Sequence, residues 1–532
     1  MRTERGVYVL LLLYGLLLLA PTPWLPLFES TEARYGEIAR EMLASGNYLE
    51  PTFNGIYHFH KPPLPYWAMA AGMRLFGVNG LGVRFFGVVA ALVGLWFLYR
   101  TARLLLGNEL PARTALLVLA SSALFLAVSR IPSTDIYLTA SVLAAQYFLF
   151  RQIHGERSTG NVLAYALCLA LGFLMKGPLV FLFTLLPFLL AKLVDERHRK
   201  VFPLRDILLA AGLFLMIALP WYLVVIHRHP ELLNYFLKVQ TVNRVATNQF
   251  GRDKPFWFYI MVFGSTFLPW LLFFLRGAVT PRSLPVAVRP LLLYVLVPFV
   301  VFSLAKSKLA TYLLPLYGVA AIIAAAQLHQ QEERTLRGFA LGILALFSLA
   351  LALAGFFYRP LEPFRWLLGV YGGMGLVLLG WGRTRLLGSS FVPCCAALLL
   401  AISTAGYALL PEIQTESKGY ARMAAAMDRL DRARDLEVVV YHGFLPSLSF
   451  HREKLAIMAL GRWREVEFEG DGSYRKYYVE TEQELRERLA GLPRIFMVTE
   501  PVNAGEFQTT YGYACGEVFS QRRYTAYLCS RR

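Results

Sequence analysis

Residues 6–28 read GVYVLLLLYGLLLLAPTPWLPLF and contain no charged side chain. A helix needs about 20 apolar residues to cross the hydrocarbon core of a bilayer, so this segment is long enough to span one. Arg2 and Arg5 precede it, as positive residues precede the apolar part of a signal peptide. The segment is nevertheless long and lacks a small-residue cleavage site, so it is predicted to remain as a membrane anchor.

Further apolar runs of similar length follow, and with the first they predict about thirteen spanning helices. A chain with 56% hydrophobic and only 17% charged residues cannot bury its apolar surface in one water-soluble core, which also indicates a polytopic α-helical membrane protein. Leu64 to Phe76 is apolar but short, and it is interpreted as an interfacial or re-entrant helix. The further predicted spans are residues 79–99, 112–128, 135–150, 161–175, 177–194, 206–227, 256–275, 290–305, 309–327, 338–357, 364–381 and 389–409.

The net charge of +18 points to anionic partners. The Lys and Arg residues lie in short clusters between apolar runs and form no continuous basic face, so nucleic acid is not an expected partner. Membrane lipids with anionic headgroups and phosphate-bearing substrates are expected instead. A cytoplasmic N-terminus agrees with the positive-inside rule, because it places the arginine-dense loops inside. Those loops are Arg100 to Arg113, Arg151 to Arg157, Lys192 to Arg205, Arg276 to Arg289 and Arg383 to Arg385.

Several cations remain on the predicted outer side, where the positive-inside rule disfavours them. Such charges at a membrane edge are candidates for function, and gathered on one side they indicate an anionic ligand. The external tyrosines, among them Tyr35 and Tyr57, are further candidates for binding it. The cations are Arg34, Arg40, Lys61, Arg130, Lys176, Lys306 and Lys308.

Thr31 to Met42 is predicted to form an amphipathic interfacial helix with Thr31 or Ser30 as its cap. Glu37 and Glu41 are spaced i, i+4 with Arg34 and Arg40 nearby, which favours a salt-linked, solvated face. Glu32 lies in the first turn, where it either complements the helix dipole or takes part in catalysis.

Asp135 and Lys176, in later external turns, each have a structural and a functional interpretation. Asp135 begins a span and either caps that helix or also binds substrate. Lys176, at a Gly-Pro turn, is either a snorkelling lysine or a substrate ligand. Lys306 and Lys308 are followed by Tyr312, which would put a hydroxyl in the next span. Carboxylates among Lys, Arg and Tyr suit a reaction in which a phosphate leaves, because cations stabilise its developing charge.

No cofactor is required by this chemistry, although a divalent metal is possible. His58 and His60 share a face only in an extended strand and supply at most half of a tetrahedral site, so they are weak candidates.

Residues 411–532 are predicted to form a soluble α/β domain outside the membrane, whereas residues 1–410 form the transmembrane domain with a first external loop at 29–78. The stretch KGYARMAAAMDRLDRARD has helical spacing, and LEVVVYHGF, AIMAL, YYVET and PRIFMVTE are strand candidates. The domain either covers the site and guides an acceptor or only stabilises the bundle. Cys515 and Cys529 fall in it, and outside the cytoplasm a disulfide between them is permitted.

An ordered series of motifs resembles the aminoarabinose transferases of lipid A modification and, more widely, the protein mannosyltransferase superfamily. The resemblance implies the C-type glycosyltransferase fold and an active site at the periplasmic face of the bacterial inner membrane. It also implies transfer of a sugar, 4-amino-4-deoxy-L-arabinose or a relative, from undecaprenyl phosphate to lipid A phosphate or another extracytoplasmic acceptor. The motifs are ESTEARYGEIAREMLASGNY, HKPPLPYW, LFGVNGLGVRF, FLMKGP, KPFWFY with LPW, and KSKLATYLLP.

Carried over by position, the resemblance assigns substrate roles to matching residues. Arg34, Tyr35 and Lys61 match the first-loop and KP motifs, and the other matches are Asp135, Lys176 and Tyr312. Met175 replaces a common threonine and Ala310 a proline.

A further departure concerns the paired acids that open the first-loop helix, which are often Asp-Glu in the family. They are Thr31-Glu32 here. Glu32 is therefore the candidate catalytic carboxylate, with Glu29 or Asp135 as substitutes, and Lys61 completes the catalytic set.

Two other functions remain open. A protein O-glycosyltransferase would use the same kind of donor, and its hydroxyl acceptor would need a general base. A transporter of lipid-linked sugars would also need many helices, but it favours a site near the midplane and often an internal repeat, which the sequence lacks.

Overall fold

The computed structural model describes residues 2–532 except residues 30, 156, 200, 244–252, 331–333, 358, 382–389, 416–418 and 462–471. The proposed cap Ser30 and the loop Arg383 to Arg385 lie outside the described residues. The chain divides into two compact units, which we call the bundle unit (Met1–Leu18 and Gly87–Ala408) and the loop–tail unit (Leu19–Phe86 and Leu409–Arg532). Residues 19–86 thus group with the C-terminal tail in this division, whereas the sequence placed the first external loop in the transmembrane domain; the predicted domain bounds stay a prediction.

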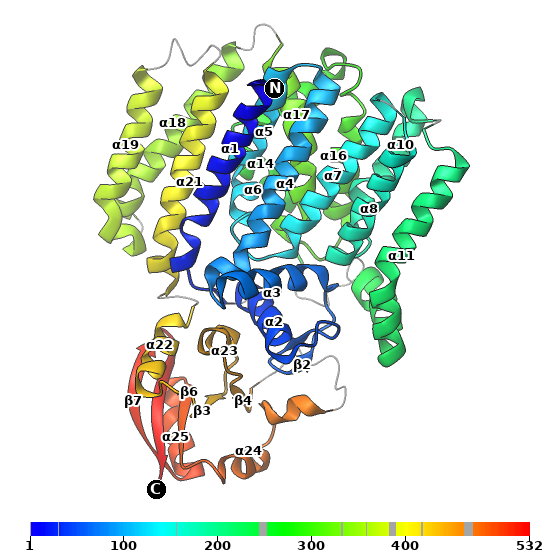
Figure 1. Cartoon of the computed structure of the whole chain (residues 1–532). Coiled ribbons are helices and arrows are strands. Elements are labelled where there is room, and N and C mark those ends of the chain that lie inside the picture. Colours follow the sequence, from blue (N-terminus) through cyan, green and yellow to red (C-terminus); the bar gives the residue numbers. More distant parts are fainter. Residues whose placement is uncertain are drawn as a thin grey trace. The chain divides into compact units, whose positions relative to one another are not determined.

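The bundle unit is built of helices (Figure 1). They are α1 (Arg2–Leu19), α4 (Gly80–Leu106), α5 (Glu109–Ser121), α6 (Ala123–Val128), α7 (Thr134–His154), α8 (Thr159–Lys176), α9 (Leu179–Phe183), α10 (Leu185–Val194), α11 (Leu204–Arg228), α12 (Glu231–Asn234), the π-helix η3 (Tyr235–Asn243), α14 (Phe258–Thr266), α15 (Leu271–Val279), α16 (Leu291–Leu304), the 3-10 turn η5 (Ala310–Leu313), α17 (Leu314–Leu328), α18 (Arg334–Phe357), α19 (Arg365–Trp381) and α21 (Phe391–Thr415).

Each predicted span falls on one of these helices or on two consecutive ones. Among the described residues, five helices are long and apolar enough to cross a membrane, or up to six if the bent pair α14 and α15 counts as one span. The number of spanning helices, thirteen, therefore stays a prediction. The first span was predicted to reach Phe28, but α1 ends at Leu19, because Pro21 and Pro23 cannot continue it and a 3-10 turn, Thr22–Trp24, follows.

The interior of the bundle unit is formed by α17 and α7. In the apolar 18-residue stretch of Ala310–Leu328, 94% is buried, whereas in the corresponding stretch of α11 only 17% is buried. α11 therefore presents apolar side chains outward. α7 packs against α8 and α17, and α8 packs against α11. Buried side chains cover nearly all of α7, including Asp135. A charge at that position lies in the interior and not on a lipid-facing surface.

The loop–tail unit begins with α2 (Thr31–Ser45), a short hairpin of β1 (Thr52–Phe53) and β2 (Ile56–Tyr57), and α3 (Leu64–Phe76). The predicted interfacial helix at Thr31 to Met42 is thus a helix, and α3 occupies the short apolar segment interpreted as a helix too short to span.

The tail folds as the predicted α/β domain around a six-stranded sheet in the order β5-β4-β3-β6-β8-β7. β3, β4, β5 and β6 run parallel, and β8 and β7 are antiparallel additions at one edge. The elements are α22 (Ala421–Leu430), β3 (Glu437–Tyr441), α23 (Pro446–Arg452), β4 (Ile457–Ala459), β5 (Tyr478–Val479), α24 (Glu482–Leu489), β6 (Arg494–Thr499), α25 (Pro501–Tyr511), β7 (Tyr513–Gln521) and β8 (Tyr524–Arg531).

Alternate residues of the parallel strands pack on opposite faces of this sheet. Val438 and Val440 pack in a cluster with Met423 and Met427 of α22. On the other face, Val439 packs in a cluster with residues of α24 and α25, including Leu485 and Phe507. A sheet covered on both faces explains why LEVVVYHGF is continuously apolar over β3.

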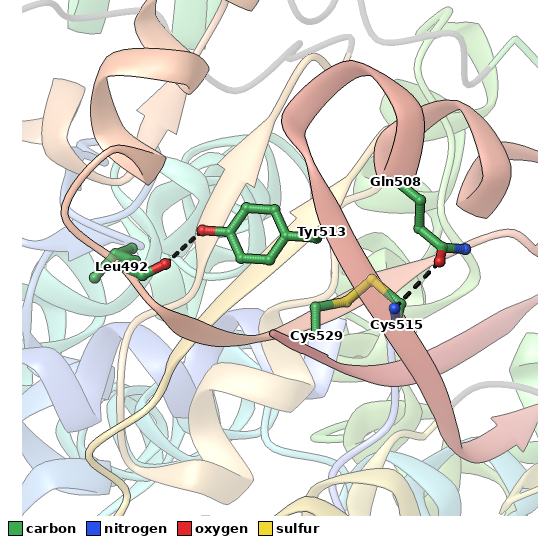
Figure 2. Close-up of a disulfide and its surroundings, with 5 residues drawn as sticks. All are labelled: Leu492, Gln508, Tyr513, Cys515 and Cys529. Atoms are coloured by element: carbon green, nitrogen blue, oxygen red, sulfur yellow. Dashed lines mark hydrogen bonds between the residues drawn. A yellow bond between two sulfur atoms is a disulfide. The ribbon is translucent and has the colours of Figure 1, made fainter. Parts of the chain in front are cut away.

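The β7–β8 hairpin holds a disulfide between Cys515 and Cys529, which lie opposite each other in the register (Figure 2). The Cys515 amide donates to Gln508 Oε1 at 3.1 Å, and Tyr513 Oη donates to the Leu492 carbonyl at 2.6 Å. These two strands were not among those predicted from the sequence. The turn residues of the β7–β8 hairpin, Arg522 and Arg523, are not the Asn-Gly pair that marks a hairpin in a sequence.

Candidate active site

Glu32, the candidate catalytic carboxylate, lies in the first turn of α2 and forms a buried ion pair. Its Oε2 accepts from Arg84 Nη2 at 2.7 Å and from the Phe28 amide at 3.2 Å. Arg84 also donates to the carbonyls of Leu25 and Pro26 at 2.8 and 3.0 Å. Burial raises the pKa of Glu32, and Arg84 opposes that rise. Glu32 thus fixes the chain that leads into α2.

Arg84 was missed by the sequence reasoning, although it lies in the quoted motif LFGVNGLGVRF. Its side chain is only 1% exposed. The signal that could have found it is an arginine near the start of an apolar span, where an ionisable group normally has a partner.

Glu37, Arg40 and Glu41 of α2 are buried, so the predicted solvated face is wrong while the predicted salt link is confirmed. Arg40 donates to both carboxylate oxygens of Glu37, at 2.8 and 2.7 Å. Glu41 accepts from the Thr52 hydroxyl at 2.7 Å and from the amide of Gly55 at 3.0 Å, both in the hairpin. Burial and then the charge of Glu37 raise the pKa of Glu41 to about 7.

A cluster of basic side chains lies beside the hairpin. The Arg34 guanidinium lies 5.8 Å from the centre of the Phe53 ring, and His58 packs edge-on against the same ring at 5.7 Å. The His58 and His60 rings stack at 4.0 Å. Burial, and then the charges of His60, Arg34 and Lys61, hold the pKa of His58 well below its ordinary value. We call Arg34, His58, His60 and Lys61 the basic cluster.

The geometry of the basic cluster suits an anion. Lys61 is only 9% exposed, and its Nζ donates to the His60 carbonyl at 3.1 Å. The two candidate tyrosines also take part in ring contacts of this unit, Tyr35 with Tyr66 at 5.8 Å and Tyr57 with Phe59 at 5.9 Å. Cations in a water-poor site attract a phosphate more strongly than they would in bulk water.

A metal fits this cluster poorly. The described part of the chain contains no group of three or more His, Cys, Asp or Glu side chains that could hold an ion. His58 and His60 alone give two ligands, and the charges of Arg34 and Lys61 act on the same ring. The donor set therefore suits an anionic ligand better than a cation.

The second set of candidates lies in the bundle unit, where Asp135 and Lys176 form a buried ion pair. Asp135 lies in the first turn of α7 and Lys176 is the last residue of α8. The Lys176 ammonium also lies 4.7 Å from the centre of the Tyr312 ring. The structure therefore brings these three predicted residues together.

Two structural interpretations of this set are wrong. The cap of α7 is Ser133, whose hydroxyl accepts from the Asp135 amide at 3.3 Å, so the Asp135 carboxylate is not the cap. Lys176 does not snorkel, because its ammonium is buried in the ion pair.

The other bundle candidates have different surroundings. Lys308 donates to the carbonyls of Lys254, at 3.0 Å, and Ala305, so its charge holds the backbone of this segment. Lys306 is exposed. Arg130 is buried and donates to the Thr404 hydroxyl at 3.2 Å. The basic cluster and the Asp135–Lys176 pair belong to different compact units, and their predicted convergence stays a prediction.

Comparisons with known proteins agree with the resemblance noted in the sequence. Residues 60–223 match the family model described as dolichyl-phosphate-mannose-protein mannosyltransferase. The undecaprenyl phosphate-alpha-4-amino-4-deoxy-L-arabinose arabinosyl transferase of Edwardsiella ictaluri is 30% identical over 82% of both chains. The corresponding transferase 1 of Proteus mirabilis is 31% identical over 78% of both chains.

The fold is shared with a solved structure. The crystal structure of ArnT from Cupriavidus metallidurans bound to undecaprenyl phosphate matches 98% of both chains with a TM-score of 0.85 and 21% identity. The apo form matches with a TM-score of 0.82. This similarity confirms the predicted fold class, a many-helix membrane bundle with a C-terminal α/β domain, apart from the number of spans.

Proposed function

The chain belongs to the undecaprenyl phosphate-aminoarabinose arabinosyl transferase family, and on that premise we propose that it is a membrane glycosyltransferase acting on a lipid-linked sugar. It moves 4-amino-4-deoxy-L-arabinose, or a closely related sugar, from undecaprenyl phosphate to a phosphate of lipid A. The observation that carries this proposal is 30% identity over 82% of both chains with a curated transferase of that name.

The basic cluster is proposed to bind the donor phosphate. When the bond to the sugar breaks, the lipid phosphate leaves with additional negative charge, which fixed cations stabilise without reorganising. Lys61 and Arg34 supply that charge, and the stacking of Arg34 on Phe53 holds the guanidinium in place. In the bundle unit, Lys306, which is exposed, is proposed as a substrate ligand.

The carboxylates then have positioning roles. A lipid A phosphate is already anionic, so it needs little general-base catalysis before its oxygen attacks the anomeric carbon. Lys176 would attract such an acceptor, while Asp135 holds the ammonium in place. Glu32 orients the start of α2, which carries Arg34 and Tyr35. A hydroxyl acceptor, as in protein O-glycosylation, would instead require Asp135 or Glu32 as a base.

We further propose that the protein spans the bacterial inner membrane many times, with the N-terminus in the cytoplasm and the tail in the periplasm. The loops rich in arginine support this orientation.

The first test measures turnover of purified undecaprenyl-phosphate-linked sugar by the wild type and by Lys61→Ala. Removal of a cation that stabilises the leaving group should lower turnover by about a hundredfold. Lys476→Ala is the control, because it removes a lysine of the tail, one whose ammonium lies 5.1 Å from the centre of the Tyr477 ring. Equal turnover in both variants would remove Lys61 from the site.

The second test identifies the acceptor. Mass spectrometry of lipid A and of glycoproteins is compared between cells with and without the protein. Loss of an amino sugar from lipid A supports the proposal. Loss of the sugar only from proteins would instead support protein O-glycosylation. A transporter is indicated if lipid A and glycoproteins are unchanged and the lipid-linked sugar accumulates on one side of the membrane.

A further inference from the structure

The first-loop hairpin and the tail are joined by a closed set of side-chain hydrogen bonds. Ser449 Oγ donates to Asn54 Oδ1 at 3.2 Å, and Asn54 Nδ2 donates to the Ala456 carbonyl at 3.2 Å. The Ala456 amide completes the set by donating to Ser449 Oγ at 3.2 Å. Asn54 is fully buried and Ser449 is 1% exposed. These bonds connect positions 395 residues apart in the sequence.

The side-chain amide of Asn54, as distinct from its main-chain amide, is not needed to close the hairpin turn. Asn54 has φ +51°, a left-handed conformation that asparagine tolerates and glycine adopts without cost. Glu41 already binds the main-chain amides of the turn, those of Asn54 and Gly55. A buried amide is costly unless its hydrogen bonds are made, and those of the Asn54 side chain are made by the tail. Asn54-Gly55 is the pair typical of such a turn, and the side-chain amide of Asn54 makes its hydrogen bonds with the tail.

The residue beside Asn54 connects this contact to the basic cluster. Phe53 is 1% exposed and packs edge-on against Phe444 of the tail at 5.2 Å. The same ring contacts Arg34 at 5.8 Å and His58 at 5.7 Å. A shift of the hairpin relative to the tail would therefore move the ring on which Arg34 and His58 rest.

The place of Phe444 in the tail fold agrees with such a role. Phe444 follows β3 in the chain. Four strands of the sheet, in the order β5-β4-β3-β6, are parallel, and β3 is the first of these four in the sequence. In doubly wound sheets, ligands bind outside the carboxyl ends of the strands, beside the first strand. Here the connection at the carboxyl end of β3 carries an aromatic ring that packs against the hairpin.

We infer that Asn54 and Ser449 are positioning residues of the donor site, through which the tail fixes Phe53 and thereby the basic cluster. This inference rests on the proposed function, because it assigns the donor phosphate to that cluster. It also decides between the two roles that the sequence left open for the tail: the domain takes part in donor binding and does not only stabilise the protein.

The test compares four variants in the full-length protein. Ser449→Ala removes both hydrogen bonds of the hydroxyl, and Ser449→Thr retains the hydroxyl. Thr499→Ala is the matched control, because it removes another buried tail hydroxyl, one that donates to the Tyr441 carbonyl at 2.8 Å, within the tail. Asn54→Gly, which retains the turn conformation, serves as a second route if Ser449→Ala does not accumulate.

Two quantities are measured, the KM and kcat for the lipid-linked sugar and the binding of undecaprenyl phosphate alone. We expect Ser449→Ala and Asn54→Gly to raise KM about fivefold, with a smaller change in kcat. A change of about fivefold is the size expected from the net contribution of a typical hydrogen bond. Ser449→Thr should restore wild-type KM, and Thr499→Ala should leave KM unchanged even where it lowers the melting temperature.

The outcomes separate this inference from the proposed function. If Ser449→Ala and Thr499→Ala have the same KM and the same affinity for undecaprenyl phosphate, the tail only stabilises the protein and the inference is wrong. If Lys61→Ala weakens binding in that same experiment, the proposed function still stands. If the wild type does not bind undecaprenyl phosphate, both fail together.

Discussion

Lys176 at the end of α8 and Asp135 at the start of α7 form a buried ion pair, with the Lys176 ammonium also placed over the Tyr312 ring. Asp135 and Lys176 each had a structural and a functional interpretation in the sequence, and Tyr312 had a substrate role implied by the family resemblance. Their contact means that a change to one alters the electrostatic surroundings of the other two. It also makes the pair testable by a double-mutant cycle, in which structural and catalytic contributions separate.

Removing one member of the Asp135–Lys176 pair should destabilise the protein more than removing both. Breaking a buried pair costs about 3–5 kcal/mol, because an uncompensated charge is left behind. We expect Asp135→Asn and Lys176→Met each to lower the melting temperature, and the double variant to recover part of the loss. Turnover should stay low in all three. Wild-type turnover in the double variant would show that the pair is structural only. Melting temperature in detergent and turnover are the measurements.

Glu32 and Arg84 should behave as one unit. If Glu32 mainly orients the start of α2, Glu32→Gln and Arg84→Met will lower turnover by similar factors, and the double variant will be little worse than either. The expected coupling energy is about 1–3 kcal/mol. The cycle is measured as turnover of the lipid-linked sugar. A Glu32→Gln loss far larger than that of Arg84→Met would instead indicate that Glu32 acts on the substrate.

Glu29 should make stability depend on pH. Its carboxylate accepts from the Ser447 amide at 2.8 Å. Burial raises its pKa from 4.5 to about 7, with Ser447 and Arg34 opposing the rise and Glu37 adding to it. The folded protein therefore keeps a proton that the unfolded chain releases, so this contribution to stability is present below about pH 4.5 and is lost as pH rises through about 7.

The matched variant for Glu29 is Glu29→Gln, which keeps an oxygen for the Ser447 amide but cannot titrate. The melting temperature of Glu29→Gln minus that of the wild type should be larger at pH 8 than at pH 5, because only the wild type loses stability as Glu29 ionises. Thermal unfolding in detergent at both pH values measures this difference. Parallel pH profiles for the two proteins would contradict the prediction.

The Cys515–Cys529 disulfide should be detectable by thiol counting. The chain has five cysteines, and Cys168, Cys394 and Cys395 are free in the structure. Titration in denaturant should find three thiols before reduction and five after it. The Cys515→Ser and Cys529→Ser double variant should lose up to about 3 kcal/mol of stability, whereas Cys168→Ser should not show that loss. Five thiols in the unreduced protein would exclude the bond and weaken the periplasmic placement of the tail.

The sequence alone was sufficient for features that depend on local pattern. Apolar runs of spanning length mark a membrane protein, because backbone polar groups in lipid must be satisfied within the helix. The same local logic located α2, α3 and the parallel strands of the tail, whose apolar runs end at turns. Motifs such as HKPPLPYW and FLMKGP predicted Lys61 and Lys176 as candidate site residues, since short chemical motifs stay readable without knowledge of their partners.

Only the tertiary structure decided which groups meet. The partner of Glu32 is 52 residues away at Arg84, and Ser449 meets Asn54 across 395 residues. No periodicity reports such pairs, because they depend on how distant segments pack. Burial likewise changed Glu37 and Glu41 from apparent surface charges into parts of the interior. The sequence thus determined the class of protein and its candidate residues, whereas packing determined which of them contact each other.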